Sequence, residues 1–220
     1  GNTVFRGVLY VAGWVPRVII AERDNHDLRE RVAELTARQA IVKDILKENQ
    51  KHRDALGYRG QNPYTFNLSG AQVIGRSPDR WFESLLINRG SRDNVKPEQA
   101  VLSDKGLVGR IMEVNLLSAS VMMLTDPRSA VSGTIARTSD IGLVVSAPRQ
   151  MLSIKYLPLN ADVQVGDDIL TSGISDIFPK GIPIGSVVHV GRQENEFFLD
   201  IHIKPAVDFS SLHELFIARR

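Results

Sequence analysis

Cysteine is absent from this chain of 220 residues. Without it the chain has no disulfide bonds, zinc–thiolate sites, iron–sulfur clusters or thiol nucleophiles. A strong net charge is missing too, because 27 Lys and Arg residues nearly balance 25 Asp and Glu residues and leave +2 at pH 7. Basic residues are dispersed and rarely lie beside aromatic ones, so we expect no nucleic-acid partner.

Long uninterrupted apolar runs are also missing. The most apolar stretch near the start, residues 4–20, is broken by Arg6, Pro16 and Arg17 and is too short to span a bilayer. The chain begins with Gly1 rather than Met, which leaves open a signal or membrane-spanning segment upstream. With 43% hydrophobic residues the chain can still bury a substantial core, so a wholly disordered protein is excluded.

Glycine is absent from residues 14–56 and proline from residues 17–62, whereas both are scattered through the rest of the chain. Within this segment apolar and neutral residues follow a 4,3 spacing, which is typical of a coiled-coil heptad. The repeat runs through Val18, Ala21, Asn25, Leu28, Val32, Leu35, Gln39, Val42, Leu46, Asn49, Arg53 and Leu56. The spacing predicts one helix over residues 17–57.

We predict that this helix forms a parallel homodimer. A helix of about 40 residues is far longer than the average of about 11 to 12 in globular proteins, which favours a coiled coil. Asn25 and Asn49 would weaken the dimer while fixing its register. The predicted seam residues are Leu28, Val32, Leu35, Val42, Leu46, Asn25 and Asn49. The alternative is an amphipathic helix that lies on a globular core.

From residue 66 onward the apolar period changes to two. Leu199, Ile201 and Ile203 alternate with polar residues, as in a half-buried strand. Further strands are predicted at residues 71–74, 84–88, 100–102, 107–114, 120–124, 133–136, 141–146, 153–156, 168–171, 185–190 and 215–218. Short strands separated by Gly, Pro, Asp and Asn indicate a sandwich or barrels.

The β-rich half contains an internal repeat. VKPEQAVLSDKGLVG, residues 95–109, matches VQVGDDILT, residues 163–171, followed by KGIPIG, residues 180–185. The alignment sets Gly106 against Gly181 in a turn and Gly109 against Gly185 early in the outgoing strand, with one extra loop in the second copy. A glycine inside a strand pattern suggests a bulge or a barrel corner. The repeat therefore predicts two related β subdomains.

No pattern for chemistry accompanies these glycines. A phosphate loop would need GxxxxGKS or GxGxxG opening a helix, and neither occurs. The five His residues show no HxH, HxxH or HExxH spacing, and no GDSG or GxSxG serine turn exists. We therefore assign no catalytic residue, no metal ligand and no cofactor.

Four stretches of the β-rich half are distinctive: WFESLLINRGSRDNVKPEQAVLSDKGLVGRIMEV (81–114), LTDPRS (124–129), YLPLNADVQVGDDILTSG (156–173) and FPKGIPIGSVVHV (178–190). In this order and spacing they resemble the MreC family of bacterial rod shape-determining proteins. Asn94 and Glu98 stand where the family usually has Gly. Asn tolerates a left-handed backbone, so we expect a turn at Asn94, but at Glu98 we expect an ordinary backbone angle.

The resemblance implies a single-pass inner-membrane protein whose part seen here lies in the periplasm. Residues 1–16 would be a juxtamembrane segment, 17–57 the coiled-coil helix, 58–68 a linker, and 69–220 two small β-barrel subdomains. That fold looks like a chymotrypsin-type double barrel without a working catalytic triad.

The resemblance also implies the partners. A family member is a non-catalytic scaffold of the cell-elongation complex that binds and activates the class B penicillin-binding transpeptidase working with RodA. It associates with MreD, MreB and RodZ. It also associates with itself as a homodimer, and assembly into filaments stays open. Two other functions stay open: a hydrolase on a double barrel, and a periplasmic adaptor of a transport system. The adaptor needs a helical hairpin, whereas here one helix precedes all the strands.

Overall fold

A computed structural model describes residues 28–41, 43–44, 67–76, 83–191 and 197–219. The chain divides into two compact units, Gly1–Asn62 and Pro63–Arg220, and each is described by itself. The first contains the helix and the second contains all the described strands.

The first unit is helical over residues 28–41 and 43–44. Every residue of this helix whose burial is described is exposed, including the apolar Leu28, Val32 and Leu35. An ion pair one turn apart, Arg38 Nη2 to Glu34 Oε1 at 2.6 Å, supports the helix. The predicted helix is therefore confirmed in its central part. Its predicted ends near residues 17 and 57 lie outside the described residues.

The described residues of the second unit form twelve strands. Their bounds are β1 Asn67–Arg76, β2 Ser84–Ile87, β3 Ala100–Leu102, β4 Leu107–Val114, β5 Ala119–Met123, β6 Ala130–Ile135, β7 Ile141–Ala147, β8 Met151–Lys155, β9 Asp168–Thr171, β10 Pro183–Gly191, β11 Asp200–Pro205 and β12 Glu214–Arg219. Short 3-10 turns lie at Ser91–Asp93 and Pro148–Gln150. Each predicted strand overlaps one of these, and β3, β4 and β9 agree at both ends.

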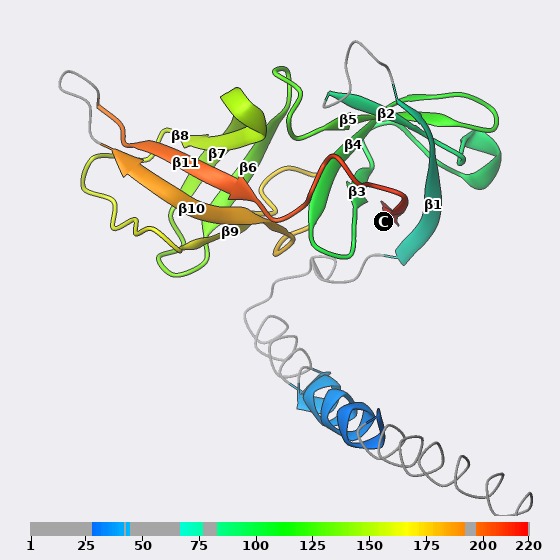
Figure 1. The fold of residues 1–220 in the computed structure, drawn as a ribbon, viewed down its shortest axis with the longest axis horizontal. Coiled ribbons are helices and arrows are strands. Elements are labelled where there is room, and N and C mark those ends of the chain that lie inside the picture. The colour runs from blue at the N-terminus through cyan, green and yellow to red at the C-terminus, as the bar shows by residue number, and fades with distance from the viewer. Residues whose placement is uncertain (1–27, 42, 45–66, 77–82, 192–196, 220) are drawn as a thin grey trace, which may run out of the picture. The chain divides into compact units, whose positions relative to one another are not determined.

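The strands close into two six-stranded antiparallel barrels, which confirms the predicted fold class of two small β-barrel subdomains (Figure 1). Barrel 1 has the order β1-β12-β3-β4-β5-β2, and barrel 2 has the order β10-β11-β8-β7-β6-β9. The C-terminal strand β12 thus returns to barrel 1, and barrel 2 is inserted between β5 and β12. Closed barrels leave no free strand edge.

Both barrels share one connectivity. When β12 is taken as the first strand of barrel 1, the cyclic order β12-β1-β2-β5-β4-β3 corresponds to β6-β7-β8-β11-β10-β9 in barrel 2. Strands β3 and β4 then match β9 and β10, which are the segments of the sequence repeat. The topology therefore supports two related subdomains.

Alternate side chains of the strands fill the barrels. Ile87, Leu107 and Ile111 are fully buried in barrel 1, as are Ile184 and Ile201 in barrel 2. Each such side chain stabilises the fold by roughly 1.5–3 kcal/mol. The buried apolar residues of both barrels form one connected cluster.

Gly109 and Gly185 occupy matching places in the two barrels. Gly109 pairs with Val101 and Gly185 with Ile169, and in both ladders the register shifts by one residue just before the glycine. A Cβ atom would lie 1.8 Å from the Met122 carbonyl oxygen at Gly109, and 2.2 Å from that of Lys204 at Gly185. The neighbouring strand therefore approaches too closely for any side chain.

Gly106 and Gly181 lie in the corresponding turns but differ by one position. Gly106 directly precedes Leu107, which pairs with Leu102, whereas Ile182 separates Gly181 from Pro183, which pairs with Leu170. Their φ angles are 155° and 87°. A Cβ atom at Gly106 would lie 2.4 Å from the Pro183 carbonyl oxygen of barrel 2, whereas Gly181 faces open space.

Glu98 departs from the expectation for its backbone. Asn94 has φ 60°, the left-handed angle expected there, but Glu98 also has a positive φ of 65°, so the ordinary angle predicted for it is wrong. Its N–H donates to the Ile111 carbonyl at 2.9 Å and its carboxylate binds Arg110. These contacts hold the residue in a conformation that costs roughly 1–2 kcal/mol outside glycine.

Replacing Gly109 by Ala tests the close approach of β5. We expect Gly109→Ala to lower the free energy of unfolding by about 3 kcal/mol, because the new methyl group meets backbone that cannot yield without moving a strand. Chemical denaturation would measure this. The matched control is Gly70→Ala on β1, where no atom lies within 4 Å. Equal free energies of unfolding for the two variants would contradict the close approach of β5 to Gly109.

Candidate interaction surfaces

The helix carries the first candidate surface, an apolar stripe. Leu28, Val32 and Leu35 follow the predicted 4,3 spacing, and their exposed fractions are 61%, 60% and 65%. An apolar stripe along a helix is normally buried against another element. The remaining predicted seam residues, Asn25, Val42, Leu46 and Asn49, lie outside the described residues. Dimerisation through this stripe stays a prediction.

The second candidate surface is an aromatic patch on barrel 2, formed by Tyr156, Leu159, Phe197 and Phe198. The exposed fractions are 63% for Tyr156, 84% for Phe197, 42% for Phe198 and 38% for Leu159. The Tyr156 and Phe198 rings meet edge to face with centroids 5.6 Å apart. Such a geometry is favourable for aromatic pairs and fixes one ring against the other.

Local backbone pairing explains how the aromatic patch forms. Beyond the end of β8, Pro158 forms a bridge with Phe198, and the Leu199 N–H donates to the Leu157 carbonyl at 2.9 Å. Leu157 and Leu199 are buried, so their neighbours must point to solvent. The patch is not among the sequence predictions, because strand alternation lets only one of two consecutive Phe residues face outward, whereas here both Phe197 and Phe198 are exposed.

Charged and histidine side chains follow the aromatic patch on β8, β10 and β11. Asp200 Oδ1 is 3.9 Å from Lys155 Nζ, and Asp200 Oδ2 is 3.5 Å from His202 Nε2. The His202 and His189 rings lie 5.5 Å apart. Apolar residues bordered by balanced charges are typical of a protein–protein interface.

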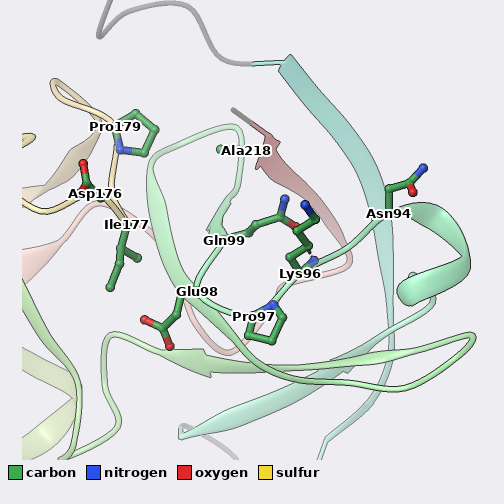
Figure 2. A pocket seen from close by; sticks show the side chains of 9 residues that line it. All are labelled: Asn94, Lys96, Pro97, Glu98, Gln99, Asp176, Ile177, Pro179 and Ala218. Carbon is green, nitrogen blue, oxygen red and sulfur yellow. Dashed lines mark hydrogen bonds between the residues drawn. The ribbon is translucent and has the colours of Figure 1, made fainter. Parts of the chain in front are cut away.

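A groove of about 520 Å³ lies between the segment before β3 and the loop before β10 (Figure 2). Its lining combines charged, amide and apolar side chains: Asn94, Lys96, Pro97, Glu98, Gln99, Asp176, Ile177, Pro179 and Ala218. None of these lining residues is a Ser, Cys or His. No cluster of three potential metal ligands is found in the part of the chain that the structure describes.

An arginine holds the loop that follows the aromatic patch. Arg137, after β6, donates through Nε to Asp167 Oδ1 at 2.9 Å and through Nη1 to Asp162 Oδ2 at 2.5 Å. These hydrogen bonds lower the pKa of Asp162 and of Asp167 below the usual carboxylate value. The same hydrogen bonds raise the pKa of Arg137. The contacts tie the β8–β9 loop to barrel 2.

Loss of this arginine should change how stability depends on pH. A lowered carboxylate pKa contributes stability above the unfolded pKa and loses it as pH falls through the folded value. We expect Arg137→Gln to lower the melting temperature at pH 7 and to weaken the loss of stability between about pH 5 and pH 3.

Thermal melts across this pH range would measure the effect. The matched control is Arg92→Gln, which removes an exposed charge from barrel 1. If the melting temperature of Arg137→Gln depends on pH in the same way as that of Arg92→Gln, Arg137 does not stabilise the ionised forms of the two aspartates.

The chain is similar in sequence to a known family and to proteins of several bacteria. The family model described as "Rod shape-determining protein MreC, barrel core" matches residues 73–219. The cell shape-determining protein MreC of Listeria monocytogenes is 29% identical over 227 residues, which cover 100% of this chain and 77% of that protein. The protein of the same name from Bacillus subtilis is 30% identical over 211 residues, covering 90% of this chain and 72% of that protein.

Solved structures show the same architecture. The structure of Listeria MreC superposes with a TM-score of 0.78 at 29% identity, over 90% of this chain and 96% of that one. A structure described as the major periplasmic domain of the cell shape-determining filament MreC gives a TM-score of 0.63 at 23% identity, over 70% of this chain and 96% of that one. A complex between penicillin-binding protein PBP2 and MreC from Helicobacter pylori gives 0.60 at 19% identity, over 70% of this chain and 98% of that one.

Proposed function

Because this chain belongs to the MreC family of rod shape-determining proteins, we propose that it is a periplasmic scaffold of the bacterial cell-elongation complex. Members of this family determine cell shape and are generally structural rather than catalytic. In the proposed role the chain organises and activates a class B penicillin-binding transpeptidase. The complex formed by the Helicobacter relative with PBP2 supports a partner of this class.

The observation that carries the proposal is the separation of the chain into a helix with an exposed apolar stripe and a unit of closed barrels. A closed barrel has no strand edge for pairing, so it contacts partners through its side chains. Leu28, Val32 and Leu35 of the described helix are exposed, and an apolar stripe of this kind is normally buried against another element. A second copy of the helix would bury it in a parallel coiled coil.

The remaining partners and the membrane setting follow from the same proposal. The scaffold would sit beside RodA, MreD and RodZ, with MreB on the cytoplasmic side, and would be anchored in the inner membrane. In the part of the chain that the structure describes, no helix is both long and apolar enough to cross a membrane.

The two alternatives find less support. A chymotrypsin-type hydrolase would need a Ser nucleophile and a His base, and neither residue type lines the described groove between the barrels. A transport adaptor would need a helical hairpin, and the described helical residues, 28–41 and 43–44, precede all the described strands.

Charges placed in the seam test the proposed dimer. Changing Leu28, Leu35 and Leu46 together to Glu should convert the dimer into a monomer, because three buried apolar contacts per helix become repulsive. Sedimentation equilibrium of residues 1–220 at high micromolar concentration would measure the mass. The melting transition of the barrels should not change.

The matched control places the same charges elsewhere on the helix. Ala33, Ala37 and Ala40 lie off the 4,3 spacing, and changing these three to Glu should leave the dimer intact. If the unaltered chain is a strict monomer, or if both triple variants dissociate equally, the seam assignment fails.

A further inference from the structure

We propose that the outer face of strands β10 and β11 binds one divalent transition-metal ion between His189 and His202, with Zn²⁺ as the test ion. The two histidines supply two ligands, water supplies the others, and Asp200 lies beside them. Such a site is independent of the scaffold role, because it needs neither the transpeptidase nor the helix.

Strand pairing brings the two histidines onto one face of barrel 2. His189 of β10 lies directly opposite His202 of β11 in the antiparallel ladder, and residues paired in this way point to the same side of a sheet. That side is the outside of the barrel, because Ile201 and Ile203, which flank His202, are buried. The histidines come from different strands, so no short sequence motif indicates this site.

The distance between the two imidazole rings suits a shared metal ion. Their centroids lie 5.5 Å apart, and the ring planes are tilted by 43°. A Zn–N bond is about 2.0–2.1 Å long, so two imidazoles on one tetrahedral ion have ring centres about 5 Å apart. His189 is exposed and His202 is half-buried, so both rings have room to rotate toward an ion. The strands therefore hold the two rings near the separation that binding requires.

Asp200 provides negative charge beside the histidine pair. It lies two residues before His202 on the same face of β11, and its Oδ2 atom is 3.5 Å from His202 Nε2. A carboxylate next to a histidine ligand orients the ring and raises its basicity. Lys155 Nζ lies 3.9 Å from the other carboxylate oxygen, Oδ1. The part of the chain that the structure describes has no group of three metal ligands already in place, so water must complete the coordination.

The surroundings of the pair provide space and an unused hydroxyl group. A Cβ atom at Gly191 would lie 3.0 Å from His189 Nε2, so the glycine leaves room at this nitrogen. Ser153 of β8 lies directly opposite His202 on the other side of β11 and shares its face. The Ser153 Oγ atom is buried and has no hydrogen-bond partner among the described residues. Buried hydroxyl groups normally have a partner, and a water ligand of the ion would supply one.

The donor atoms determine the class of ion. Imidazole nitrogen suits Zn²⁺, Cu²⁺ and Ni²⁺, whereas Mg²⁺ and Ca²⁺ prefer oxygen ligands. An ion held by both histidines would join β10 to β11 next to the register shift between Val187 and His189. Because the unfolded chain does not hold the two rings together, binding would stabilise the folded barrel.

Isothermal titration calorimetry of residues 1–220 with Zn²⁺ tests the site. His189→Gln and His202→Gln should each weaken Zn²⁺ binding by at least about 10-fold, since even the loss of an outer-shell partner has an effect of this size. The matched control is His213→Gln, which removes an exposed histidine just before β12 and should leave the affinity unchanged. Mg²⁺ should give no binding heat.

Electron paramagnetic resonance of the Cu²⁺ complex counts the histidine ligands. The spectrum should show two coupled imidazole nitrogens in the unaltered chain and one in either His189→Gln or His202→Gln. Neither side chain belongs to the barrel core, so both variants should keep the melting temperature of the metal-free chain.

Three results would overturn the inference. The first is the absence of Zn²⁺ binding to the unaltered chain. The second is binding that survives both His189→Gln and His202→Gln, which would place the ion elsewhere. The third is binding that only one of these two substitutions weakens, which would show a contact with a single histidine and not a shared site.

Discussion

Closure of barrel 1 by the last strand of the chain is the constraint on which the second unit depends. β12 pairs with β1 along its whole length, from Arg219 opposite Asn67 to Glu214 opposite Gln72, and also pairs with β3. Leu215, Ile217 and Ala218 of β12 are buried in the barrel. Because barrel 2 lies between β5 and β12 in the chain, barrel 1 cannot close until the chain has passed through barrel 2. The two barrels are therefore parts of one folding unit, as their shared core indicates.

Barrel closure also determines which groups of the barrels can contact a partner protein. Backbone hydrogen bonding is completed within each closed barrel, so no strand edge is offered for pairing. Specific contacts must then come from side chains that the barrel holds in place. The aromatic patch fits this requirement, because strand pairing around Phe198 and Pro158 fixes its position and Arg137 ties down the loop that follows. The helix meets the requirement differently, through an apolar stripe exposed along one side.

Much of this fold could be predicted from local patterns. Short apolar segments between turn residues located every described strand. The repeat located Gly109 and Gly185, because close strand packing imposes the same demand for glycine in both barrels. The return of β12 to barrel 1 could not be predicted, since alternation shows which face is buried but not which strand is the partner. Glu98 was assigned the wrong backbone angle because tertiary hydrogen bonding outweighs local preference there. The aromatic patch was missed because exposure depends on the arrangement of neighbouring chain segments and not on residue type.

The proposed scaffold role is tested most directly by the binding of residues 1–220 to the purified periplasmic part of the transpeptidase from the same organism, measured by interferometry. We expect saturable binding of the unaltered chain. No binding at high micromolar concentration of either protein would contradict the proposed role.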